Sequence, residues 1–313
     1  MADRRRNNGP PGGSKPLLYS CMIKSAPNKP TRPTRTRKPD ELRKIYLKTG
    51  ITPPASGSAY LELESPHHSP TFLLPSSSAL KLSVAVHGPR PLARSAAYSP
   101  HLALSCYVKF TPFATRHRRG YLRDPTEKDL STQLETALRG VIIGERYPKT
   151  GVDVCVTILE GEEDRWWAEE PLGGAASVGG WGLFGVLAGC VTAASAALVD
   201  AGIDCIDLVS GGVAALVARP LGNGDDDGKR DDGVGGEVVL DPNPTEHENI
   251  VAACVVAYVA SKDEVTLLWL RGGSSSETSE KLMDGAVSAA LASRGVLEEA
   301  LKETALLKFS EED

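Results

Sequence analysis

Twenty-nine consecutive residues, 171–199, carry no charged side chain. A stretch of this length must lie either in a bilayer or inside a protein. Gly185 and Gly189 fit the G-x-x-x-G pattern of paired membrane helices. However, the stretch contains seven glycines and no Lys/Arg cluster flanks it, which argues against a membrane span. We therefore predict a small-residue helix over residues 183–200, packed closely inside a domain and ending near Gly202.

Apolar runs before and after this helix predict the remaining elements. Residues 207–217 read as two short strands around Gly211 and Gly212, and other strands are expected at residues 57–63, 80–86, 103–109, 152–159, 237–240, 250–260 and 265–270. Helical spacing is present at 128–146 and again at 277–307, where Gly295 marks a possible bend. This order of strands and helices predicts an α+β fold with mixed sheets.

Charge divides the chain into a basic head and an acidic body. Residues 1–40 contain ten Lys/Arg, two Asp and seven prolines, a net charge of +8, whereas the remainder carries −13. Such a head cannot bury enough apolar surface to order itself. We predict a disordered tail over 1–40 and one domain over 41–313, with loop insertions near 64–78, 160–182 and 222–236. The charge pattern fits a tail that contacts nucleic acid or an acidic partner, not a DNA-binding domain that is basic throughout.

The cysteines and acidic loops give no sign of a metal site. The six cysteines are at least 15 residues apart, so no C-x-x-C motif exists, and reduced thiols are expected. The loop at 222–236 opens like a calcium loop, but its twelfth position is Val234 rather than Glu. A second acidic cluster, at 241–248, reads as a solvated loop. We expect no metal, no cofactor, no signal peptide and no membrane partner.

Seven short strings follow one another in the order found in one protein family. They are GSAYLE at 57–62, VAVHGPR at 84–90, ETAL at 135–138, YPKTGVDV at 147–154, TAASAALVDAGI at 192–203, DLVSG at 207–211 and LMDGA at 282–286. Together they resemble the RNase PH family, most closely the RNase-PH-like ring subunits of the RNA exosome, over about residues 40–305.

The resemblance implies a ribosomal-protein-S5-like α+β fold and a six-membered ring built with other RNase-PH-like subunits. It also implies an S1/KH-type cap protein on one face of the ring and single-stranded RNA in its channel. Active members degrade RNA from the 3′ end with inorganic phosphate as the attacking group. That reaction needs cationic and hydrogen-bonding clamps for phosphate, and a carboxylate for metal or proton handling.

Several residues that active members need have no counterpart in this chain. An ungapped alignment places Pro125-Thr126 at the Arg pair, Val186-Leu187 at the Thr/Ser-Arg pair, and Glu248 and Cys254 at the two acidic positions. Both anion clamps and one carboxylate are therefore missing, so no catalytic residue is expected. The resemblance thus implies a non-catalytic subunit that completes the ring, seats the cap protein and guides RNA, in the nucleus, nucleolus and cytoplasm.

Five arginines are the expected RNA contacts. Arg90 and Arg94 belong to a loop that the resemblance places near the channel entrance, and Arg116, Arg118 and Arg119 form the other basic cluster of the body. Solvated surface charge remains the alternative for each of them. Three alternatives remain for the whole chain. They are an active phosphate-dependent exoribonuclease, a contributor of basic residues to a neighbour's active site, and a free-standing RNA adaptor that acts through residues 1–40.

Overall fold

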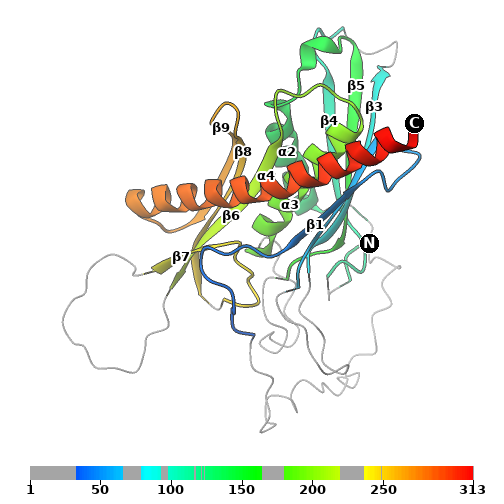
Figure 1. Cartoon of the computed structure of the whole chain (residues 1–313). Coiled ribbons are helices and arrows are strands. Elements are labelled where there is room, and N and C mark those ends of the chain that lie inside the picture. The colour runs from blue at the N-terminus through cyan, green and yellow to red at the C-terminus, as the bar shows by residue number, and fades with distance from the viewer. Residues whose placement is uncertain are drawn as a thin grey trace, which may run out of the picture.

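The computed structural model describes residues 33–65, 79–92, 98–115, 118–120, 122, 124–163, 180–218, 236–247 and 249–312. In this part of the chain, two sheets and three α-helices are stacked in alternating layers (Figure 1). Most of the predicted tail, residues 1–32, and most of the three predicted insertions lie outside the described residues.

The first sheet has five strands in the order β1-β2-β3-β5-β4. The strands are β1 (Ile45–Thr49), β2 (Gly57–Leu63), β3 (Lys81–Pro91), β4 (Ala103–Phe110) and β5 (Thr150–Glu160). All neighbours are antiparallel except β4, which runs parallel to β5. The strand predictions are confirmed apart from β1, which was missed because only five residues of it pair.

Helices α2 (Pro125–Arg139) and α3 (Gly182–Asp200) lie between the two sheets. The helix predicted over 128–146 is shorter than expected, because it ends at Arg139 and only a 3-10 turn, Gly144–Arg146, follows. Among the described residues, α3 is the one helix long and apolar enough to cross a membrane, and 94% of its most apolar window is buried inside the fold. The predicted close packing of this helix is confirmed.

The second sheet has four antiparallel strands in the order β7-β6-β8-β9. Its strands are β6 (Val209–Ala218), β7 (Gly236–Leu240), β8 (Ile250–Val259) and β9 (Glu264–Gly272). Helix α3 covers one face, and the long helix α4 (Ser276–Glu312) crosses the other (Figure 1). Helix α4 continues through Gly295 without a break.

The prediction of two short strands around Gly211 and Gly212 is wrong, because both glycines lie inside the continuous strand β6. A Cβ atom on Gly211 would overlap the backbone of Ala188 in α3. A Cβ atom on Gly212 would overlap the backbone of Ala286 in α4. The pair therefore marks a close approach of one strand to a helix on each side, not a turn.

The five cysteines among the described residues are free thiols. Cys106, Cys190 and Cys254 are buried, and Cys155 and Cys205 are half-buried. Burial raises the pKa of the Cys254 thiol to about 11.

Candidate functional site

The N-terminus of α3 is the position at which the resemblance places one phosphate clamp. The helix begins at Gly182, so Val186 and Leu187 lie in its second turn, with side chains only 1% and 0% exposed. In an α-helix the N–H groups of such residues donate to carbonyls four residues back. Neither the side chains nor the backbone donors of these two residues are available to an anion.

Aromatic side chains fill the space at the first turn of α3. Phe184 is fully buried and stacks on Trp269 of β9, with ring centroids 4.6 Å apart. The ring of Trp181, just before the helix, lies 6.0 Å from that of Phe184. The Arg271 guanidinium lies 5.5 Å from the centroid of the Trp181 ring. The first turn of α3 is therefore fixed by apolar packing.

The start of α2 is the expected position of the Arg pair. Pro125 is its first residue, and Thr126 is buried. The Glu127 carboxylate accepts hydrogen bonds from the Lys109 ammonium (3.1 Å) and from the backbone N–H groups of Phe110 (3.0 Å) and Asp124 (3.2 Å). The polar groups at this helix start thus fasten α2 to β4.

Strand β8 contains Cys254, the residue that the alignment places at the second acidic position. Cys254 belongs to the apolar cluster that packs under α4, whereas its neighbours Ala253 and Val255 belong to the core that contains α3. Since side chains alternate along a strand, the residue that faces α3 is Ala253, not Cys254. Glu248 lies outside the described residues.

The structure does not bring the predicted RNA contacts together. Arg90 lies next to the last residue of β3, opposite Gly151; its side chain forms an ion pair with Asp153 and is 59% exposed. Arg119 lies at the other end of the sheet, with its guanidinium 3.9 Å from the centroid of the Phe110 ring. The two ends are seven residues apart along β5, about 23 Å at 3.3 Å per residue. Arg118 is exposed beside Arg119, and Arg94 and Arg116 lie outside the described residues.

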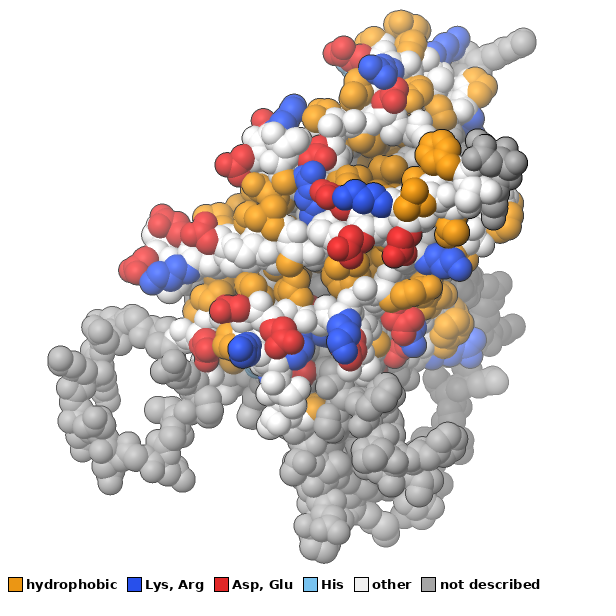
Figure 2. Space-filling view, viewed as in Figure 1, with side chains coloured by type: hydrophobic (Ala, Val, Ile, Leu, Met, Phe, Trp, Pro, Cys, Tyr) orange, Lys and Arg blue, Asp and Glu red, His pale blue; other side chains and the backbone are white. Residues whose placement is uncertain are grey.

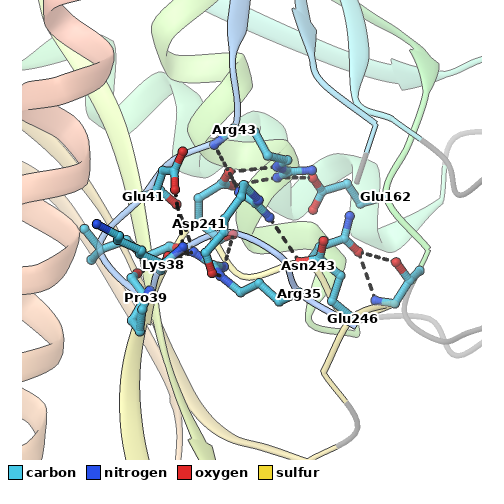
Figure 3. A network of polar contacts seen from close by, with 12 residues as sticks. Arg35, Lys38, Pro39, Glu41, Arg43, Glu162, Asp241, Asn243 and Glu246 are labelled. Atoms are coloured by element: carbon cyan, nitrogen blue, oxygen red, sulfur yellow. Dashed lines mark hydrogen bonds and ion pairs between the residues drawn. The ribbon is translucent and has the colours of Figure 1, made fainter. Parts of the chain in front are cut away.

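A buried ionic network joins residues 33–43 to the segment after β7 (Figure 3). The Arg43 guanidinium donates to both carboxylate oxygens of Asp241, at 2.7 and 2.6 Å, and lies 2.5 Å from a Glu162 oxygen. The side chains of Arg43 and Glu162 are 1% and 0% exposed. Burial raises the pKa of Glu162. Burial also acts to raise the pKa of Asp241, but Arg43 outweighs it and holds that pKa well below its usual range.

Two further arginines extend this network along the segment assigned to the tail. Arg37 contacts Asp241 at 3.3 Å and Glu246 at 3.0 Å. Arg35 donates to the backbone carbonyls of Leu240 (3.0 Å) and Asp241 (3.3 Å). Residues 33–40 therefore lie against the body instead of extending as a free tail, because partners some 200 positions away order them.

The acidic cluster at 241–248 was interpreted as a solvated loop, and that interpretation is wrong for two of its members. The Asp241 and Glu246 side chains are only 16% and 2% exposed, and arginines neutralise both. The burial of these two acids depends on their ion pairs with Arg37 and Arg43, and no local sequence pattern predicts such distant pairs. Within the described part of the chain, no three His, Cys, Asp or Glu side chains are grouped so as to hold a metal ion.

Comparison with known proteins identifies the family. The pattern of the RNase PH family (3' exoribonuclease family, domain 1) matches residues 41–204. The chain belongs to the RNase PH family.

Its relatives match along most of the chain. The exosome complex component MTR3 of Chaetomium thermophilum is 48% identical, covering 97% of this chain and 99% of its own length. The human protein of the same name is 29% identical over 84% of this chain and 80% of its own length. Rrp41 of Pyrococcus horikoshii, an exosome complex component, is 30% identical over 88% and 90%.

Among solved structures, rice Rrp46 matches with a TM-score of 0.60 at 18% identity, covering 85% of this chain and 98% of that chain. The RNase-PH-like α+β fold expected from the sequence is confirmed.

Proposed function

We propose that this chain is a non-catalytic subunit of the six-membered RNase-PH-like ring of the RNA exosome, where it supports 3′-to-5′ RNA processing and degradation. The observation that carries the proposal is that this chain is 48% identical, over nearly its full length, to a protein named as the exosome component MTR3. The sequence strings resemble the same mRNA-transport-regulator type of subunit. Membership implies other RNase-PH-like subunits and a cap protein as partners, and residence in the nucleus, nucleolus and cytoplasm.

The described residues support the absence of catalysis. At α3, the clamp position is occupied by Val186 and Leu187, both buried. On β8, the residue facing α3 is Ala253, which can neither bind a metal nor move a proton. Removal of one preorganised donor costs an enzyme about 2.7–4 kcal/mol of transition-state stabilisation. Loss of both clamps and a carboxylate leaves too little stabilisation for phosphorolysis.

Exposed apolar side chains support membership in a larger assembly. Figure 2 shows hydrophobic side chains in patches between the charged residues around α4. Near the end of α4, Leu306, Leu307 and Phe309 are 71%, 64% and 70% exposed. Large apolar side chains grouped in this way on a surface mark contact sites for other proteins.

Co-expression with the RNase-PH-like partner subunits tests the assembly directly. We expect native mass spectrometry to show a six-membered ring that contains one or more copies of this chain. The proposal is wrong if the partners assemble fully without it and the chain elutes alone.

We further propose Arg90 and Arg94 as RNA contacts at one end of the channel, and Arg116, Arg118 and Arg119 as contacts at a second level. Support comes from the exposed guanidinium of Arg90 at one end of the five-stranded sheet and from Arg118 and Arg119 at the other end. An RNA strand running along the sheet would meet the first level and then the second.

Arg90→Ala is expected to weaken RNA retention by the assembled ring about three- to tenfold, because one phosphate contact is lost. Lys281→Ala is the matched control, since Lys281 on α4 is 61% exposed and also ion-paired, with Glu277. Filter binding at two salt concentrations measures both. Equal retention by the two variants would remove Arg90 from the RNA path.

A further inference from the structure

Phe113 lies in the loop that leaves β4, and its aromatic side chain is 73% exposed. It occupies the tip of a turn in which the Ala114 N–H donates to the Thr111 carbonyl at 3.0 Å. The nearby Phe110, by contrast, is 1% exposed and packs in the core. A single exposed apolar side chain is common on protein surfaces. The surroundings of Phe113 therefore decide what its ring can do.

The turn that carries Phe113 is fixed to the body of the sheet. Pro112 precedes the ring, so one backbone torsion of the turn is locked. Ala114 follows the ring; it is 2% exposed, and its carbonyl accepts a hydrogen bond from the Gly161 N–H at 2.8 Å. A ring that is held in place before a ligand arrives loses little conformational entropy on binding. Phe113 is thus a preorganised aromatic surface.

The same loop carries positive charge to the side of the ring. Residues 109–123 contain five Lys/Arg and no Asp/Glu. The Arg119 N–H donates to the Pro112 carbonyl at 3.1 Å, which brings the basic cluster back beside Phe113. Arg118, the neighbour of Arg119 in this cluster, is exposed to solvent.

Two of these cations are also held by acidic residues that follow the loop. Lys109 pairs with Glu127 at 3.1 Å, and Arg119 lies 4.0 Å from Asp124. These contacts fix the positions of the two cations but leave their side chains 38% and 25% exposed. The loop therefore presents an aromatic ring and partly exposed cations on one fixed surface.

This combination fits single-stranded nucleic acid. One base stacks on an exposed aromatic ring while neighbouring cations bind the phosphates of the backbone, and any base can do so because every base has a π face. In a duplex the bases already stack on one another, so only an unpaired strand offers a face to the ring. A protein partner would need an apolar pocket for the ring and acidic groups for the cations at the same place.

We infer that Phe113 is a base-stacking residue: one base of a single-stranded RNA stacks on its ring while Arg118 and Arg119 bind the adjacent phosphates. The inference rests on the proposed function, in which Arg116, Arg118 and Arg119 contact RNA. It adds to those charges the contact that distinguishes a single strand from a duplex.

Four variants of the full chain test this role. Phe113→Ala removes the ring, Phe113→Trp keeps an aromatic face, and Arg118→Ala removes a phosphate contact. Tyr46→Ala is the matched control, because Tyr46 is an aromatic residue, 55% exposed, on β1 at the opposite edge of the same sheet. Each variant is assembled with the RNase-PH-like partners. Binding of an unstructured single-stranded RNA and of a duplex RNA to the ring is then titrated at several salt concentrations.

We expect Phe113→Ala to weaken single-strand binding about tenfold, because stacking on one base is lost. Duplex binding and the slope of log affinity against log salt should stay unchanged, because the ring carries no charge. Arg118→Ala should instead reduce that slope by about one. Phe113→Trp and Tyr46→Ala should bind within about twofold of wild type.

Single-strand binding by Phe113→Ala within about twofold of wild type would overturn the inference. So would an equal loss in Phe113→Trp, or a loss of duplex binding as large as that of single-strand binding. Failure of Phe113→Ala to enter the ring, when Phe113→Trp enters it, would assign the ring to a protein neighbour instead. Failure of the wild-type chain to enter the ring refutes the proposed function, and the same titrations on the chain alone then test Phe113.

Discussion

Arg43→Ala is expected to lower the free energy of unfolding by about 3–5 kcal/mol, since it leaves buried carboxylates without their cation. Arg43 is 1% exposed and holds both Asp241 and Glu162. The cost comes from two desolvated acids, one of which must take up a proton or draw water into the core. Chemical denaturation of the full chain measures the change through its midpoint and slope.

Lys44→Ala provides the control next to Arg43 in the sequence. Lys44 pairs with Glu64 at 3.5 Å, but its side chain is 87% exposed. Exposed ion pairs contribute little to stability, so we expect the free energy of unfolding to change by less than about 0.5 kcal/mol. Similar losses in the two variants would show that the Arg43 network does not fasten residues 33–43 to the body.

Gly211→Ala is expected to destabilise the fold by about 3 kcal/mol, at the upper end of ordinary overpacking, because backbone rather than a side chain opposes the new methyl group. The added Cβ atom would overlap the carbonyl oxygen and Cα atom of Ala188, so α3 would have to move away from β6. Thermal unfolding followed by circular dichroism measures the loss of stability as a lower midpoint temperature of unfolding.

The same glycine-to-alanine substitution at Gly295 is expected to raise the free energy of unfolding instead of lowering it. Nothing lies within 4 Å of a Cβ atom built on Gly295, and the residue is inside α4. Exchange of glycine for alanine in a helix stabilises it by about 0.5–1 kcal/mol. An unaffected Gly211→Ala variant would contradict the close packing of β6 against α3, and a destabilised Gly295→Ala variant would contradict the open position of Gly295 within α4.

The elements that could be predicted from the sequence are those that a local pattern specifies. The alternation at Gly57–Leu63 and the continuous apolar run in Thr150–Glu160 predicted β2 and β5, and the uncharged stretch predicted α3. Strand β1 was not predicted, because the short stretch Ile45–Thr49 has too few residues to show an alternation of apolar and polar side chains. Gly211 and Gly212 were interpreted as a turn, because glycine is favoured both in turns and where a strand closely approaches a helix.

The candidate site depends on contacts that sequence spacing does not specify. An ungapped alignment does not show which face of β8 a residue lies on, and only the pleat of the strand shows that Ala253 faces α3 and Cys254 faces α4. Charge composition placed Arg35 and Arg37 in a free tail, although their partner Asp241 is more than 200 positions away.

The claim that this family member has lost catalysis is tested most directly by a phosphate-dependence assay. The chain alone, the partner subunits alone and the assembled ring are each given a 3′-labelled single-stranded RNA, with and without inorganic phosphate. We predict no release of nucleoside diphosphates that requires this chain, together with retention of RNA by the ring. Phosphate-dependent release by the chain, or by the ring but not by its partners alone, above a host-contaminant control, would contradict the account.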